Sequence, residues 1–178
     1  MTTFTRDMLQ PITLRAVTSD AGPALHAMLT RCSPDSLRAR FLGTNASAAE
    51  QYVHTVLTDD RQVSVLAWQD DRVLAVGSIL YDSSVACAEI GLLVEDVWQH
   101  KGLGDCIASL LIEAVSTAGL DYLCAHLGVT NLPAHALITR MCPNARWLHP
   151  ENGVLDVVIP VDGITTTARP AQLLGEAL

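Results

Sequence analysis

One short stretch of the sequence has the residue types that bind an anion at the start of a helix. It reads Gln99-His100-Lys101-Gly102-Leu103-Gly104 and follows an apolar run that ends at Val94. Glycines at a helix start let an anion approach the backbone, where unpaired N–H groups and the helix dipole bind negative charge. The pattern is neither a GxxxxGK phosphate loop nor a dinucleotide fingerprint, which needs a third glycine. We therefore expect an anion-binding turn of another kind.

A single carboxylate interrupts the apolar run before this turn. Glu89 is the one acidic residue between positions 85 and 94. A carboxylate can act as a general base and accept a proton from a substrate through a water molecule. A structural glutamate, bonded to a neighbouring strand or at a solvated edge, is the alternative interpretation. Glu89 is the candidate catalytic base of the chain.

The elements around the turn are predicted by periodicity. Residues 102–118 form an amphipathic helix, and Gly119 stands where a C-terminal cap belongs. The apolar positions of this helix are Leu103, Ile107, Leu110, Leu111, Ala114 and Val115. Before the turn, the ranges 63–68, 73–81 and 85–94 predict three antiparallel strands, the first two joined by a polar hairpin at 69–72. Because these strands are apolar on both sides, they need helices on both faces.

The other segments complete a mixed α/β order. A strand is expected over 12–17 and a helical segment around 25–29. Two further helix starts are predicted at Ser33-Pro34 and at the capping box that begins with Ser47. A strand over 121–127, a helix over 133–141 and a last strand over 154–161 follow. We interpret residues 1–178 as one domain, with an N-terminal extension over 1–10 and a tail over 164–178.

Length, composition and charge exclude several classes of protein. The chain has 178 residues, of which 49% are hydrophobic, which is enough for a buried core and too apolar for a disordered chain. Its 11 Lys and Arg against 19 Asp and Glu give a net charge of −8, which argues against nucleic acid as a partner. No window approaches about 18 uninterrupted apolar residues, so no membrane span is expected. The first ten residues have no apolar signal segment, and we expect a cytoplasmic protein.

The cysteines and histidines are dispersed along the chain. Five cysteines, an odd number without CxxC spacing, predict free and buried thiols in a reducing cytoplasm rather than disulfides or a zinc site. Cys124 and His126 would share one face of a strand, but two candidate ligands do not make a metal site. We interpret this pair as packing residues and expect no metal.

The turn and its neighbours resemble a known family. Residues 99–104 match the Q/R-x-x-G-x-G/A pyrophosphate loop of the GNAT superfamily of acyl-CoA N-acyltransferases, and the preceding strand and following helix are where that family has them. Asn131, followed by Ala134, resembles the N-x-x-A start of the family's next helix. The range from Ser33-Pro34 to Arg40-Phe41 is similar to a segment of some bacterial protein-lysine acetyltransferases. The resemblance implies an α/β GNAT fold, with a mostly antiparallel twisted sheet of six to seven strands and helices on both faces.

The resemblance also implies a donor and the residues that bind it. The donor would be acetyl-CoA, whose pantetheine arm lies along the strand before the loop in this family. Its partners here would be the backbone of Leu92, Leu93 and Val94, with Asn131 near the pantetheine or the thioester. The residues whose N–H groups would hold the pyrophosphate are Gln99, His100, Lys101, Gly102, Leu103, Gly104 and Asp105. The side chain of Lys101 would either serve the phosphates or be solvated.

The reaction implied is the transfer of an acetyl group to a primary amine, of a small molecule or of a protein lysine, by direct attack on the thioester. A free lysine has a pKa of about 10.4, so a base must remove a proton. Histone acetyltransferases use a glutamate in an Ala-Glu-Ile context on this strand, which supports Glu89. Measured from Gln99, Glu89 lies one residue closer to the loop, and one residue changes the face of a strand unless a bulge compensates. Backbone amides of Leu92 and Leu93 would polarise the thioester carbonyl.

One departure from the family concerns the general acid. The family often has a tyrosine seven residues after the asparagine, where this chain has Ile138. Tyr81, Tyr122 and Cys142 are the candidate substitutes. An active N-acetyltransferase and an acyl-CoA-binding sensor with weak or no catalysis are therefore both consistent with the sequence. An unrelated anion-binding domain is a third interpretation, and a homodimer is expected from the family.

Overall fold

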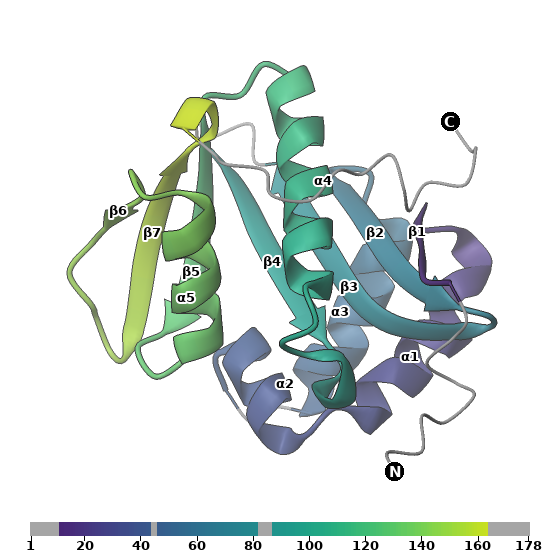
Figure 1. Cartoon of the computed structure of the whole chain (residues 1–178). Helices are drawn as coiled ribbons and strands as arrows, with labels where there is room; N and C mark the ends of the chain where they lie inside the picture. Colours follow the sequence, from purple (N-terminus) through teal and green to yellow (C-terminus); the bar gives the residue numbers. More distant parts are fainter. Residues whose placement is uncertain (1–10, 44–45, 82–86, 164–178) are drawn as a thin grey trace, which may run out of the picture.

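The computed structural model describes residues 11–43, 46–81 and 87–163. Seven strands form one sheet in the order β1-β2-β3-β4-β5-β7-β6, and all neighbouring pairs except β4 and β5 are antiparallel (Figure 1). The strands are β1 Thr13–Ala16, β2 Gln62–Gln69, β3 Arg72–Tyr81, β4 Ala88–Val94, β5 Tyr122–Gly128, β6 Arg146–Trp147 and β7 Val154–Pro160. The predicted α/β class and mostly antiparallel sheet are confirmed.

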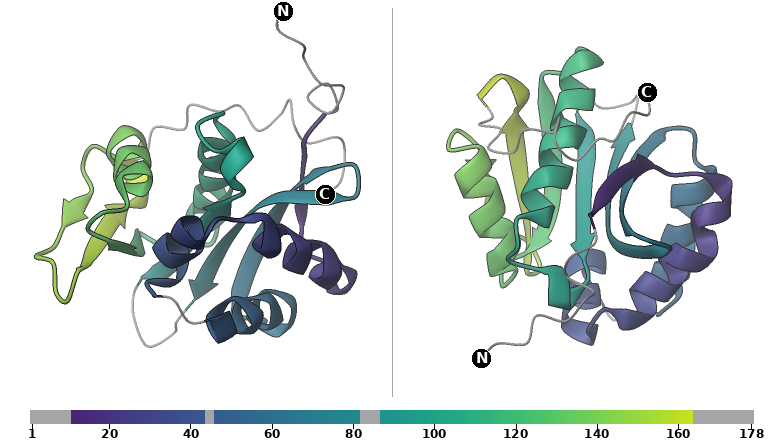
Figure 2. Two further views of the ribbon diagram at one scale, coloured as in Figure 1. Left: turned by 90° about the horizontal axis from the view of Figure 1, so that it is seen from below. Right: turned by 45° about the vertical axis from the view of Figure 1, so that its right-hand side comes forward.

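Helices cover both faces of the sheet, as its apolar strands require (Figure 2). The helices are α1 Gly22–Arg31, α2 Pro34–Phe41, α3 Ala46–Thr58, α4 Leu103–Thr117 and α5 Leu132–Met141. Alternating residues of β3 divide between two apolar clusters. Val76 packs with α1 on one face, whereas Ile79 packs with α4 on the other. Helix α4 approaches β3 closely at Gly77, where a Cβ would lie 2.9 Å from Leu111 Cδ1.

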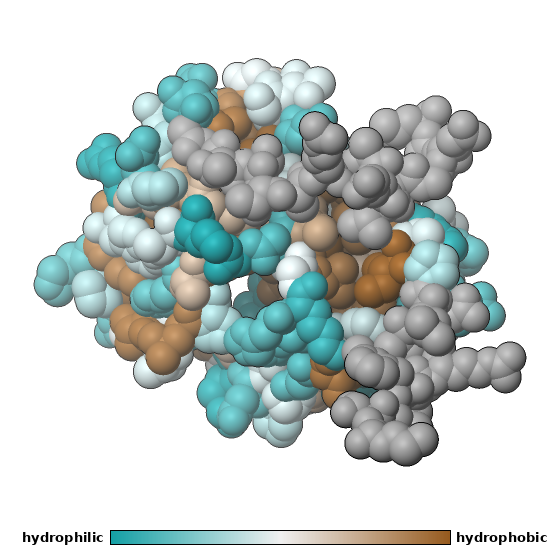
Figure 3. All heavy atoms as spheres, in the orientation of Figure 1, coloured by the Kyte–Doolittle hydropathy of each residue, from teal (hydrophilic) through white to brown (hydrophobic). Residues whose placement is uncertain are grey.

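The central strands β4 and β5 separate along their length. Their parallel pairing comprises Ala88↔Leu123 and Glu89↔Cys124, at the beginning of both strands. Beyond these positions the two strands diverge, and β5 with α5, β6 and β7 forms a separate wing of the sheet (Figure 1). The space-filling view is hollowed at the same place, between α5 and the start of α4 (Figure 3). The divergence therefore opens a gap in the middle of the sheet.

Most predicted elements lie within two or three residues of the observed ones. Helix α4 begins at Leu103 behind Gly102, and Gly119 has the positive φ of 75° expected of a C-terminal cap. Helix α3 begins at Ala46, so Ser47 lies inside the helix, and the prediction that it caps the helix in a capping box is wrong. Strand β6 was not predicted, because two exposed residues carry no periodicity. The predicted N-terminal extension and C-terminal tail lie outside the described residues.

Candidate functional site

The gap between β4 and β5 exposes backbone groups of β4. The N–H of Glu95 donates to Leu74 O on β3 at 2.9 Å, so by alternation the backbone of Leu93 also faces β3. The backbone groups of Leu92 and Val94 then face the gap, where an extended ligand can pair with them as an added strand. Among the predicted pantetheine partners, Leu92 faces the gap with both backbone groups and Val94 with its N–H, while Val94 O accepts from Gln99 Nε2 at 3.0 Å. Leu93 does not face the gap, because its hydrogen-bonding groups belong to the β3 ladder.

The predicted anion-binding turn lies between the end of β4 and α4. His100 and Gly102 both have positive φ, 58° and 82°, and this tight path ends at the first residue of the helix. The first helical hydrogen bond is from Cys106 N to Gly102 O, at 3.1 Å. The N–H groups of Leu103 and Gly104 therefore have no acceptor within the helix and are available to an anion.

The polar side chains of the turn are exposed or are paired with a neighbouring element. His100 and Lys101 are exposed, and Lys101 Nζ lies 4.9 Å above the ring of Trp98. Asp105, in the first turn of α4, is bound by Arg140 of α5, with Nη2 2.5 Å and Nε 3.1 Å from Oδ1. This ion pair joins the two helices that flank the gap.

Gln99 connects the turn to both of its neighbours. Its Nε2 donates to Val94 O and to Ser36 Oγ of α2, each at 3.0 Å. Asp96 makes a second connection, because its carboxylate accepts from Ser33 N, Ser33 Oγ and Ser36 Oγ at 2.6–2.9 Å. Burial alone would raise the pKa of Asp96, but these hydrogen bonds outweigh it and lower the pKa below its ordinary value. The turn therefore holds the start of α2 in place.

Asn131 and Ile138 both belong to α5, on the far side of the gap. Asn131 is the N-cap of this helix, and its Oδ1 accepts from Ala134 N at 3.3 Å. Its predicted contact with the pantetheine stays a prediction. Ile138 is half-buried against the core under α4, so the position offers packing and no proton donor.

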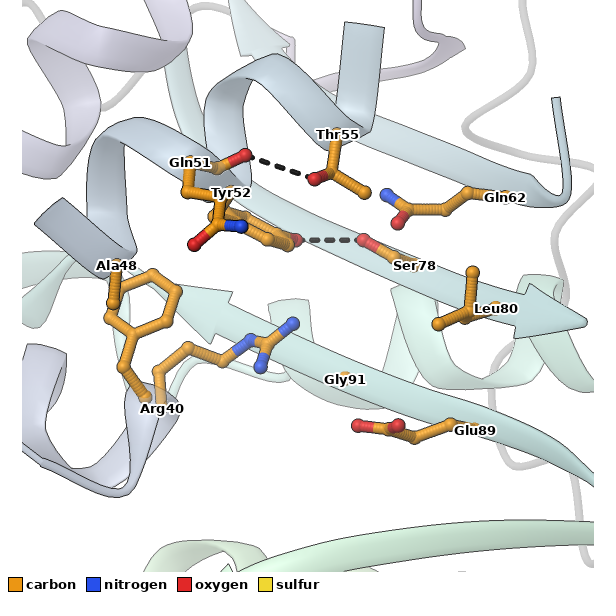
Figure 4. Close-up of a pocket in the computed structure, with 11 residues that line it drawn as sticks. Arg40, Ala48, Gln51, Tyr52, Thr55, Gln62, Ser78, Leu80, Glu89 and Gly91 are labelled. Carbon is orange, nitrogen blue, oxygen red and sulfur yellow. Dashed lines mark hydrogen bonds between the residues drawn. The ribbon is translucent and has the colours of Figure 1, made fainter. Parts of the chain in front are cut away.

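Glu89 faces the side of the sheet that α1, α2 and α3 cover. The register between β3 and β4 is regular from Ala75↔Val94 to Tyr81↔Ala88, so no bulge turns Glu89 away from the face of Gly91 and Leu93. Its exposed carboxylate lines a pocket of about 260 Å³ (Figure 4). The residues around this pocket are Arg40, Phe41, Ala48, Gln51, Tyr52, Thr55, Gln62, Ser78, Leu80, Glu89 and Gly91. Glu89 is thus at the last paired position before β4 and β5 separate, between the pocket and the gap.

The opposite wall of this pocket holds Arg40, whose place no local pattern indicated. Its guanidinium lies against Gly91, where a Cβ would come 2.7 Å from Cζ, and above the Tyr52 ring at 4.7 Å. The Tyr52 hydroxyl is 2.7 Å from Ser78 Oγ, and Ser78 is the β3 partner of Gly91. The signal for Arg40 in the sequence is its place in the segment from Ser33-Pro34 to Arg40-Phe41, which resembles some bacterial protein-lysine acetyltransferases.

The three candidate substitutes for the missing tyrosine do not line this pocket. Tyr122 is exposed on β5, and Tyr81 packs at the end of β3 on the α4 side. Cys142 is buried with its Sγ 3.8 Å from Pro160 O, and burial raises the pKa of its thiol. Tyr52, which sequence reasoning passed over, is the tyrosine that shares the pocket with Glu89.

The expectation that all cysteines are free is wrong for one pair. Cys87 and Cys124 form a disulfide between the starts of β4 and β5, with Cα atoms 6.0 Å apart. Their separation of 37 residues hid the pair, since only the strand pairing brings them together. His126 is also not a packing residue, because it is exposed and its Nδ1 lies 2.6 Å from Asp156 Oδ1.

Neither a metal cluster nor a membrane helix is found in the described ranges. No three His, Cys, Asp or Glu side chains between residues 11 and 163, outside the two internal gaps, gather as metal ligands would. None of the helices α1 to α5 is both long and apolar enough to cross a membrane.

Comparison with solved structures identifies the fold, although no family model matches the chain. The GNAT domain of S. lividans PAT is similar with a TM-score of 0.67 and 20% identity, over 83% of this chain and 89% of that one. The yncA protein of Salmonella typhimurium, solved with acetyl-CoA, has a TM-score of 0.67 and 14% identity, over 85% and 94%. The paia N-acetyltransferase of Thermoplasma acidophilum, in complex with coenzyme A, has a TM-score of 0.64 and 10% identity. The match covers 84% of this chain and 98% of that one. The chain has the GNAT fold, as expected from the residues around 99–104.

Proposed function

We propose that the protein is an acetyl-CoA-dependent N-acetyltransferase that moves an acetyl group to a primary amine. The observation that carries this proposal is the position of Glu89 at the point where β4 and β5 separate. A carboxylate there has the free edge of β4 on one side and an open pocket on the other. The fold supports the proposal, since solved structures of this fold hold CoA or acetyl-CoA.

The groups that acetyl-CoA needs are available along the gap. The amides of a pantetheine arm match the backbone N–H and C=O of Leu92 and the N–H of Val94 in the manner of an added strand, while Val94 O already accepts from Gln99 Nε2. The pyrophosphate matches the helix start, where Leu103 and Gly104 have unpaired N–H groups. Backbone binding explains how a chain with a net charge of −8 can hold a polyanionic ligand.

The chemistry proposed for the pocket is direct transfer. Glu89 accepts a proton from the acceptor ammonium, through a water molecule or directly, and the neutral amine attacks the thioester carbonyl. The N–H of Leu92 stabilises the oxyanion as the carbonyl carbon becomes tetrahedral. Collapse of this intermediate breaks the C–S bond, the attacking nitrogen gives up its second proton to solvent, and the CoA thiolate takes up a proton from solvent. A thiol with a pKa of about 8.5 leaves without a dedicated acid, consistent with Ile138 at the usual tyrosine position.

A thiol-release assay with acetyl-CoA and a panel of primary amines tests the proposal. We expect turnover above hydrolysis for at least one amine, with the N-acetyl product identified by mass spectrometry. Acetyl-CoA binding by calorimetry with no turnover for any amine would reject the enzyme and favour the sensor. No preference for CoA over inorganic phosphate would reject both.

A further inference from the structure

The pocket around Glu89 contains a positive charge that nothing in the described chain neutralises. Arg40 has no ion pair within the described ranges, and its Nε is buried without a hydrogen-bond partner. The other arginines near this face behave differently, since Arg31 and Arg72 both bind the buried Glu95. A half-buried guanidinium without a carboxylate is costly, and it is a ready binding group for a planar anion.

Aromatic rings and the backbone hold this charge in a defined position. The guanidinium carbon lies 4.7 Å from the centroid of Tyr52 and 5.5 Å from that of Phe41. Gly91 leaves the space that it occupies, because a Cβ there would collide with it. Helix α2 is itself fixed at Ser33 by Asp96, so the side chain projects from an anchored element. The remaining donors of Arg40 point into the pocket (Figure 4).

Two opposite charges therefore face one small cavity. Glu89 and Gly91 are two residues apart on the same face of β4, which separates their Cα atoms by about 6.6 Å. The carboxylate of Glu89 and the guanidinium beside Gly91 point toward each other without forming an ion pair (Figure 4). A ligand between them would present an ammonium to Glu89 and an anion to Arg40. At about 260 Å³ the pocket is smaller than common drug-sized sites of roughly 300–1,000 Å³.

We propose that the acceptor is a small amine that also carries a carboxylate, of the amino-acid class, with its carboxylate bound by Arg40 and its amine directed to Glu89. This inference rests on the proposed function and names the substrate class of the same site. The other polar groups of the wall, Gln51, Thr55 and Gln62, suit a small polar molecule. A lysine side chain within a protein brings an amine but no nearby carboxylate, so it leaves Arg40 unpaired.

Matched acceptors test the proposal directly. Free amino acids, the corresponding amino-acid amides and an end-blocked lysine peptide are compared in the thiol-release assay with acetyl-CoA. We expect at least one acid to exceed its own amide by about 10-fold or more in kcat/KM, as expected for hydrogen bonds to charged groups. Equal use of acid and amide, or preference for the blocked peptide, would overturn the proposal while sparing the N-acetyltransferase.

Three variants assign the preference to Arg40. Arg40→Gln removes the charge, and Gly91→Ala displaces the guanidinium by filling its space. Both should raise KM for the acid about 10- to 100-fold and leave KM for the amide and for acetyl-CoA unchanged. Arg38→Gln is the matched control, because Arg38 is exposed on the same helix and pairs with Asp35. If Arg40→Gln raises KM equally for the amino acid and its amide, then Arg40 acts on the thioester or on folding rather than on the carboxylate. That result would overturn the proposal.

A binding measurement separates this proposal from the catalytic one. Amino acids and amides are titrated by calorimetry into the CoA complex of the wild type and of Arg40→Gln. Binding of an acid that requires Arg40 supports the carboxylate site even if no amine is acetylated. Absence of binding by any acid, together with acetylation of other amines, rejects the site alone.

Discussion

Glu89 of β4 and Cys124 of β5 are register partners at the last paired position before the two strands separate. This relationship places the candidate base at the apex of the gap, where a ligand on the free edge of β4 would end. Cys124 also forms a disulfide with Cys87, which lies two residues before Glu89, so the bond links the starts of β4 and β5. The candidate base and the disulfide therefore lie together where the two strands begin to separate.

Glu89→Gln should lower kcat/KM for the acceptor amine by about 10²- to 10⁴-fold, the usual contribution of a general base. The dissociation constant of acetyl-CoA, measured by calorimetry, should not change, because Glu89 faces the pocket rather than the turn at 99–104. Raising the pH should partly restore the variant, since more of the amine is then neutral without help. Full activity in Glu89→Gln would contradict the assignment as a base and favour a structural glutamate at the edge of the strand.

Gly102→Ala should weaken acetyl-CoA binding. Gly102 has φ 82° at the start of α4, a conformation that costs an alanine about 1 kcal/mol. Relief of that strain would rotate the N–H groups of Leu103 and Gly104, and we expect KM for acetyl-CoA to rise about 10-fold. Gly119→Ala is the matched control at the other end of the helix, with φ 75° and equally open surroundings. Gly119→Ala should lose a similar amount of unfolding free energy, but its KM for acetyl-CoA should equal that of the wild type. Equal KM values for the two variants would contradict the assignment of the turn at 99–104 to acetyl-CoA binding.

Asp96→Asn should loosen α2 in a pH-dependent way. The pKa of Asp96 is lowered in the folded protein, so its stabilising effect is present above the ordinary value of 3.8 and is lost as the pH falls through the folded pKa. At pH 7 we expect the variant to lose about 1 kcal/mol of unfolding free energy in urea titrations. The difference from wild type should shrink below pH 3.8. Asp35→Asn, on the exposed side of α2, serves as the control, and a constant difference at all pH values would contradict the account.

Reduction of the disulfide between Cys87 and Cys124 should destabilise the protein. The bond spans 37 residues, and closure of a loop of that length stabilises by about 3–4 kcal/mol in the chain-entropy account. Dithiothreitol and Cys87→Ser should lower the urea midpoint equally, and their effects should not add. Cys106→Ser, which removes a free half-buried thiol, should still respond to dithiothreitol. A wild-type midpoint that is insensitive to dithiothreitol would show that the bond contributes nothing to stability.

Local patterns were sufficient for the elements and for the position of the glycine turn before α4. The apolar periodicity of 102–118 depends on residues within one or two turns of each other, and so do the glycine at 102 and the cap at Gly119. The N-cap roles of Ser33 and Asn131 are local for the same reason. These features could therefore be predicted from neighbouring residues, and the structure agrees with them within a few positions.

The sequence by itself determined the class of fold, the turn before α4 and an isolated carboxylate on β4. Tertiary structure alone decided which face Glu89 occupies, that Leu93 belongs to the β3 ladder and that Cys87 meets Cys124. It also brought Arg40 against Gly91, 51 residues later in the chain. The physical reason is that the register of a sheet and the docking of a helix onto it depend on the packing of distant segments. Periodicity identifies such segments, but it does not contain their mutual placement.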